Sequence, residues 1–180
     1  AIDWIWRRQR IGRQRRAGDP LRGAAHHAKT GLGIGLFGQQ LCLFGLRFTA
    51  RTDLAGYHPD VAVYQVDSDD GTPVGLFLQD NFARPAKRSG AWMSVLAQQH
   101  RNSADGQPQL PVVLNNNNFA RGEPGTPTLL SPDDVRTLFH EFGHGLHGLL
   151  SNVGYRRMSG TQVLRDFVEL PSQLFEHWGQ

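Results

Sequence analysis

Apolar residues recur at three- and four-residue steps between residues 135 and 149 of the chain. They are Val135, Leu138, Phe139, Phe142, Leu146 and Leu149. This spacing predicts an amphipathic helix of about five turns. Ser131 and Pro132 precede it as a favourable N-cap and first helical residue, and carboxylates occupy the first turn. The polar, glycine-containing run at 151–154 predicts where the helix ends.

Residues 61–66, earlier in the chain, alternate with the period of two that predicts a β-strand, and residues 74–79 are expected to be the returning strand. Residues 67–71 between them end in Asp70-Gly71, a turn signal that predicts a hairpin. The acids of this turn lack the twelfth-position glutamate of a calcium-binding loop, so we expect a solvated turn.

A His-Glu-x-x-His pattern lies within the predicted helix, formed by His140, Glu141 and His144. Residues four apart are separated by about 400° around a helix, so both imidazoles emerge on one face, one turn apart. This arrangement suits a tetrahedral Zn²⁺, and Glu141 can reach a water molecule on the metal. The helical context favours a zinc protease site over a chance match.

A second helical run, 163–176, supplies candidates for the third ligand that a catalytic zinc requires. Its acids are Asp166, Glu169 and Glu176. Apolar neighbours surround Glu169, and a buried carboxylate without a partner is costly, so a metal is a favourable partner for it. Pro171 predicts a kink just after it. Glu176 is interpreted as a solvated helix-face carboxylate.

Four motifs of this region resemble those of the thimet oligopeptidase family of zinc metallopeptidases, with bacterial peptidyl-dipeptidases as the nearest branch. They span residues 140–148, 159–161, 165–173 and 176–178. The resemblance extends over about residues 43–178, and family members are several times longer than this chain.

The resemblance implies one Zn²⁺ per chain, with His140, His144 and Glu169 as ligands and Glu141 as general base. It also implies a mainly α, zincin-like catalytic domain in which a small antiparallel β-sheet precedes the metal helix. Asp166, one turn before Glu169, is a candidate for orienting a ligand imidazole. His147, three residues after His144, is interpreted as a supporting or packing group.

The expected activity is hydrolysis of short peptides by a metal-activated water, and the resemblance implies release of C-terminal dipeptides. One alternative is an endo-acting oligopeptidase of the same family. Another is a zinc-binding fragment without catalysis, because the family draws its oxyanion and substrate-carboxylate groups from a later segment. A third is a closed structural zinc site with His147 or Asp166 as fourth ligand, which the presence of Glu141 disfavours.

Residues 111–119 begin as a third predicted strand and then run into the asparagine tract 115–118, a composition typical of loops. Because it precedes the metal helix, this strand is a candidate sheet edge at which a peptide substrate adds by backbone pairing. A merely structural strand is the alternative.

The positive charge of the chain is local. Residues 1–30 hold seven Arg and one Lys against two Asp, whereas residues 31–180 hold 11 basic and 14 acidic side chains. We therefore interpret 1–42 as a basic, disordered or non-native segment and 43–180 as a partial catalytic domain. A basic tail that binds nucleic acid is the alternative, and no nucleic-acid partner is expected.

Three further patterns bear on cofactors, membrane partners and cellular location. Gly33, Gly35 and Gly38 match a dinucleotide-binding pattern, but no buried strand precedes them, so no nucleotide cofactor is expected. No apolar run approaches the roughly 18 residues of a membrane span, and no membrane partner is expected. Cys42 is the single cysteine and permits no internal disulfide, which favours a cytoplasmic location.

Overall fold

The computed structural model describes residues 44–124 and 126–179. These residues fall into two compact units, one containing 44–48 with 67–72 and the other containing 49–66 with the described part of 73–179. The basic segment 1–42, and with it the three-glycine pattern, lies outside the described residues.

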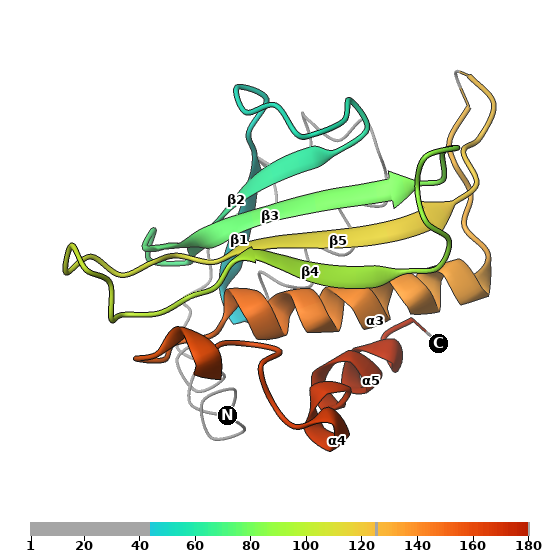
Figure 1. The fold of residues 1–180 in the computed structure, drawn as a ribbon. Helices are drawn as coiled ribbons and strands as arrows, with labels where there is room; N and C mark the ends of the chain where they lie inside the picture. Colours follow the sequence, from blue (N-terminus) through green and yellow to red (C-terminus); the bar gives the residue numbers. More distant parts are fainter. Residues whose placement is uncertain (1–43, 125, 180) are drawn as a thin grey trace, which may run out of the picture. The chain divides into compact units, whose positions relative to one another are not determined.

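The sheet has five strands in the order β1-β2-β3-β5-β4 (Figure 1). The strands are β1 (Leu46–Ala50), β2 (Ala62–Ser68), β3 (Pro73–Phe82), β4 (Trp92–Ala97) and β5 (Val112–Phe119). β5 pairs parallel with β3 and antiparallel with β4. The prediction of an antiparallel sheet was therefore wrong. The chain reverses twice after β3, first into β4 at the edge and then back into β5, which consequently runs in the direction of β3.

Alternating residues of the strands face opposite sides of the sheet. Leu78 of β3 and Leu114 of β5 belong to an apolar cluster on one side, together with Val63 of β2. Phe77 and Val113, one position before each, are fully buried and face the helix that packs on the other side, where the glycines of that helix approach them. The strands predicted at residues 61–66 and 74–79 are confirmed as β2 and β3.

The asparagine tract is part of strand β5 and is not a loop. Asn115, Asn116 and Asn117 are buried, and β5 lies between β3 and β4 in the sheet. The expectation that this strand forms a sheet edge was also wrong, because β4 occupies that position.

The helix α3 (Pro132–Leu149) begins and ends close to where the sequence predicts. The hydroxyl of Ser131 accepts a hydrogen bond from the backbone N–H of Asp134 at 3.1 Å, and the Asp134 carboxylate accepts one from the Ser131 N–H at 3.0 Å. This reciprocal pair satisfies two N–H groups that a helix start leaves without partners. The predicted metal motif therefore lies in the middle of a well-capped helix.

α3 lies between the sheet and a short C-terminal helix (Figure 1). The ring of Phe142 is fully buried and meets Phe77 of β3 edge-to-face at 5.4 Å between centroids. On its other side Phe142 packs against Phe175 at 6.4 Å. Such aromatic pairs add to the apolar area that the helix buries and fix its position against both neighbours.

The remaining helices are short: η3 (Arg156–Met158), α4 (Arg165–Val168) and α5 (Leu170–Glu176). Glu169 stands between α4 and α5, and Pro171 lies in the first turn of α5. The predicted kink is thus confirmed as a break between two helices. Among the described residues, strands hold more of the chain than α-helices do, so the mainly α prediction is not confirmed. No helix of this part is long and apolar enough to span a membrane.

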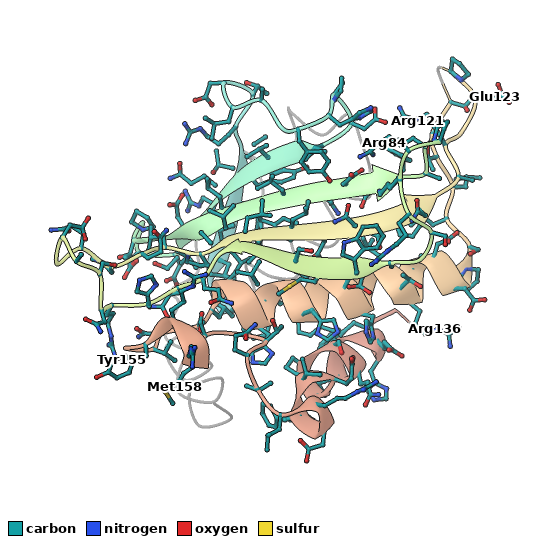
Figure 2. The ribbon with its side chains drawn as sticks, in the orientation of Figure 1. Arg84, Arg121, Glu123, Arg136, Tyr155 and Met158 are labelled. Carbon is teal, nitrogen blue, oxygen red and sulfur yellow. The ribbon has the colours of Figure 1, made fainter. Side chains whose placement is uncertain are left out.

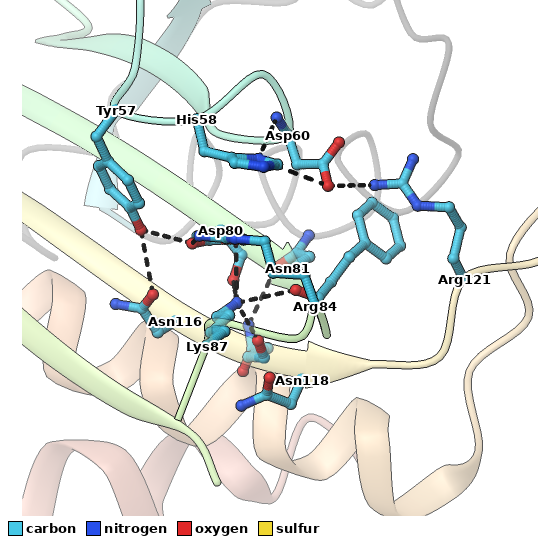
Figure 3. Close-up of polar contacts among 12 residues, drawn as sticks. Tyr57, His58, Asp60, Asp80, Asn81, Arg84, Lys87, Asn116, Asn118 and Arg121 are labelled. Atoms are coloured by element: carbon cyan, nitrogen blue, oxygen red, sulfur yellow. Dashed lines mark hydrogen bonds and ion pairs between the residues drawn. The ribbon is translucent and has the colours of Figure 1, made fainter. Parts of the chain in front are cut away.

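A buried ionic cluster fixes the loop that follows β3 (Figure 3). Asp80 is fully buried and receives hydrogen bonds from Tyr57 at 2.5 Å, from both terminal nitrogens of Arg84 at 2.7 Å, and from Lys87 at 3.0 Å. Lys87 Nζ also donates to the backbone carbonyls of Asp80, Phe82 and Asn117. Burial and the bond to Asp80 raise the pKa of Tyr57 to about 12.

Candidate metal centre

Three side chains from two segments bring their donor atoms together on one face of α3. The Nε2 atoms of His140 and His144 lie 3.3 Å and 3.1 Å from the same Oε2 atom of Glu169. One ligand atom from each of the three residues lies within 4.8 Å of the others. The two imidazole rings are 4.8 Å apart between centroids and nearly perpendicular, at 82°. Both nitrogens therefore point toward one place, as the helical spacing predicts.

A close contact between α3 and α5 places Glu169 next to the two histidines. Gly143 lies on α3 between the two histidines, and a Cβ there would lie 2.6 Å from the Cα of Ser172 on α5. Glycine thus permits the backbones to approach. The fully buried Ser172 hydroxyl, 2.9 Å from Oε2 of Glu169, donates to that oxygen and holds the carboxylate toward α3.

The three donors fit a catalytic zinc in chemistry and spacing. Two imidazole nitrogens and one carboxylate oxygen form a known three-ligand set, and atoms about 2.0–2.1 Å from a tetrahedral ion lie about 3.3–3.4 Å from one another. The separations of 3.1 and 3.3 Å to Glu169 are close to that spacing. Within the described residues the group contains neither His147 nor Asp166, the fourth ligands of the closed-site alternative.

The local electrostatics favour the charge states that a metal requires. Burial lowers the pKa of His144, against the opposing effect of Glu169, so its imidazole is neutral in neutral solution. Partial burial raises the pKa of Glu169, but the hydrogen bond from Ser172 and the two imidazoles outweigh it, and the net pKa is lowered. Neutral imidazoles and an ionised carboxylate are the metal-binding forms.

Glu141 is buried beside this group, with 6% of its surface exposed, and within the described residues its Oε2 has no hydrogen-bond partner. Burial raises its pKa to about 7, with His140 opposing the shift and Glu169 adding to it. A carboxyl group with such a pKa can both take up and release a proton at neutral pH.

One family of known proteins matches most of the chain. The model of peptidase family M3 matches residues 27–180. The chain belongs to peptidase family M3. Its match covers all residues of the candidate metal centre and begins before the first described residue.

Several M3 relatives show how much of a longer protein this chain represents. It is 42% identical over 179 residues to the dipeptidyl carboxypeptidase of Salmonella typhimurium, covering 99% of this chain and 26% of that protein. The Escherichia coli dipeptidyl carboxypeptidase is 45% identical over 149 residues, covering 83% and 21%. The Salmonella typhimurium oligopeptidase A is 42% identical over 145 residues, covering 80% and 21%. The chain thus spans about a quarter of its M3 relatives, or less.

The two supporting residues expected from the sequence occupy different surroundings in the M3 chain. His147 is half-buried, its ring packs against Phe167 at 6.3 Å between centroids, and burial lowers its pKa. Its Nδ1 has no hydrogen-bond partner among the described residues, which fits the packing interpretation. Asp166 is exposed on α4, and the carboxylate that contacts the outer nitrogen, Nδ1, of His140 belongs to another residue.

That residue is Glu176, whose contact the sequence interpretation missed. Its Oε1 lies 2.6 Å from Nδ1 of His140, so the interpretation of Glu176 as a solvated carboxylate was wrong. One signal was available: Glu176 follows Glu169 by seven residues, close to two helical turns, which places both on one helix face. The docking of α5 on α3 was not visible in the sequence.

Proposed function

We propose that this chain carries the catalytic zinc site of a peptidase that hydrolyses short peptides and releases C-terminal dipeptides. The observation that supports it is the convergence of His140, His144 and Glu169 beside the buried Glu141. The release of dipeptides is supported by the dipeptidyl carboxypeptidases that match up to 99% of the chain. Similarity to oligopeptidase A favours internal cleavage as the second candidate.

In this proposal each residue has one task. His140, His144 and Glu169 hold one Zn²⁺, which when bound supplies Lewis-acid chemistry that activates a water molecule and polarises the scissile carbonyl. Glu141, a buried carboxylate directly beside the ligand His140, accepts a proton from the attacking water and then donates it to the leaving amine. Residues 43–180 in this view form part of a catalytic domain.

We propose that the substrate backbone pairs with the outer edge of β4, which has no neighbouring strand among the described residues. This strand is the edge next to β5, and it borders the metal helix, because a Cβ at Gly148 of α3 would meet the side chains of Met93 and Val95. Backbone pairing at an edge binds peptides with little side-chain selection. The edge assigned from the sequence to 111–119 is thereby replaced by 92–97.

The test is the zinc content of the dialysed 180-residue chain beside that of a Glu169→Ala variant. The parent is expected to hold about one zinc per chain, and the variant to lose most of it. The zinc-loaded parent chain is then incubated with a pentapeptide that is blocked at its N-terminus, and the cleavage products are identified by mass. A parent that binds no zinc, or a Glu169→Ala variant that binds it equally well, would contradict the proposed site.

A further inference from the structure

The imidazole of His140 is engaged at both nitrogens by carboxylates of the same short segment. Nε2 faces Oε2 of Glu169 at 3.3 Å, and Nδ1 lies 2.6 Å from Oε1 of Glu176. The second distance is that of a charge-assisted hydrogen bond. A carboxylate oxygen accepts here, so Nδ1 carries a hydrogen, and in the metal-binding form of the ring the lone pair is on Nε2, which faces the proposed metal position.

The geometry of α5 makes this double contact possible. Glu169 precedes the first residue of the helix and Glu176 is its last residue, so about two turns separate them and both face α3. Between them, the Gly143–Ser172 approach and the packing of Phe175 on Phe142 fix the helix against α3. One rigid element thus carries a ligand at one end and a partner for another ligand at the other.

The second histidine lacks such a partner. Nδ1 of His144 is buried and has no hydrogen-bond partner among the described residues. His140 and its partner Glu176 are both only about one-quarter exposed, with side-chain values of 26% and 28%. The bond is therefore partly shielded from water, which strengthens its hold on the ring.

We propose that Glu176 is a positioning residue that fixes the tautomer and orientation of His140 for metal binding. This rests on the proposed function, in which His140 is a zinc ligand. A carboxylate on the outer nitrogen of a ligand imidazole raises the basicity of the inner nitrogen, and its removal weakens metal affinity about 10–100-fold. A role limited to holding α5 on α3 predicts a loss of stability in the metal-free chain instead.

The experiment measures the zinc Kd of the full 180-residue chain by competition with a chromogenic chelator. We compare the parent, Glu176→Gln, Glu176→Ala and Glu169→Ala with matched controls at Glu123, an exposed acid of the loop before α3 (Figure 2). Glu176→Ala is expected to raise the Kd about 10–100-fold with one zinc still bound at saturation. Glu176→Gln keeps the shape and removes the charge, so it should fold as the parent does and show a smaller rise. Neither Glu123→Gln nor Glu123→Ala should change the Kd.

A second readout addresses the ring itself. In the cobalt-loaded parent, the paramagnetically shifted Nδ1–H proton of His140 should exchange slowly with solvent, and in Glu176→Ala it should exchange rapidly or disappear. An unchanged Kd and an unchanged proton in both Glu176 variants would overturn this inference. If Glu169→Ala still abolished zinc binding in that case, the proposed zinc site would stand and only the role of Glu176 would be rejected. A parent that binds no zinc, or a Glu169→Ala variant that binds as tightly as the parent, would overturn both.

Discussion

Gly143 of α3 and Ser172 of α5 approach so closely that a Cβ on the glycine would lie 2.6 Å from the Cα of Ser172 and 2.8 Å from the backbone oxygen of Pro171. Both obstacles are backbone atoms, so no flexible side chain can move aside. The distance between the histidine-bearing helix and the segment that bears Glu169 therefore depends on the missing side chain at one position.

Gly143→Ala is accordingly expected to push α5 away from α3. Overpacking of this kind costs about 1–3 kcal/mol of stability, and the shift of Glu169 should also weaken zinc binding. Urea denaturation and the zinc Kd measure the two effects. Gly154→Ala is the matched control, because a Cβ at Gly154 meets nothing within 4 Å. Equal stability and zinc affinity in the two variants would contradict this account of the helix contact.

Glu141→Gln should leave zinc binding nearly unchanged while abolishing most peptide hydrolysis. The amide preserves the size of the side chain but cannot take up the proton, and a general base contributes about 10²–10⁴-fold to a rate. The measurement is kcat of the zinc-loaded chain, beside its zinc content. Hydrolysis at the parent rate would remove Glu141 from the proposed chemistry.

Asp80→Asn should destabilise the chain strongly, because it leaves the buried ammonium of Lys87 without its ionic partner. Breaking one side of a buried ion pair costs about 3–5 kcal/mol. Chemical denaturation in the presence of a chelator isolates this effect from metal binding. Asp105→Asn is the control, since Asp105 is exposed and accepts a hydrogen bond from the nearby backbone N–H of Gln107. If Asp80→Asn lowered the free energy of unfolding no more than Asp105→Asn does, the ionic cluster would contribute little to stability.

The same cluster predicts a pH dependence of stability. Burial raises the pKa of Asp80, but hydrogen bonds from Arg84, Tyr57 and Lys87 outweigh it and leave the folded-state pKa below the ordinary value. Because the pKa is depressed on folding, the stabilisation is fully present above the unfolded value of about 3.9 and is lost as the pH falls below it. The stability difference between the parent and Asp80→Asn should therefore narrow from pH 6 toward pH 3. A difference that stays constant across this range would refute the assignment.

Ser131→Ala removes one half of the reciprocal cap at the start of α3. The free energy of unfolding is expected to fall by about 1 kcal/mol. Urea denaturation would show this as a lower midpoint with an unchanged m-value. Ser89→Ala, in an exposed loop, should change the midpoint little. If both serines gave the same result, the capping bonds would be irrelevant to stability.

Local patterns were sufficient to predict α3 and β2, since each shows its period in the sequence, and β3, since it follows the Asp70-Gly71 turn signal. β4 escaped prediction because its residues are nearly uniformly half-buried and show no alternation. The asparagines of β5 were misjudged because their partners come from elsewhere: Asn116 accepts from Tyr57, and Asn118 donates to the carbonyls of Arg88 and Gly90.

The residues of the candidate metal centre also differ in how far the sequence predicts them. His140, Glu141 and His144 follow from helical spacing. Glu169 was a candidate because of its apolar neighbours, and the family resemblance pointed to the same residue, whereas Glu176 escaped notice. Glu176 contacts a residue 36 positions earlier, and such a contact depends on how α5 packs against α3. Helical periodicity describes the faces of one element but does not specify which faces of two elements meet.

The bonds of Lys87 have a consequence for the sheet as a whole. The regular pairing of β3 with β5 slips between Asp80 and Phe82, and the ammonium donates to carbonyls on both strands there, at Asp80, Phe82 and Asn117. At this point a side chain substitutes for the amide groups that normally join neighbouring strands. The pairing of β3 with β5 at this end therefore depends on one charged side chain. Neutralising Lys87 would let β3 and β5 separate here, while the rest of their pairing stayed intact.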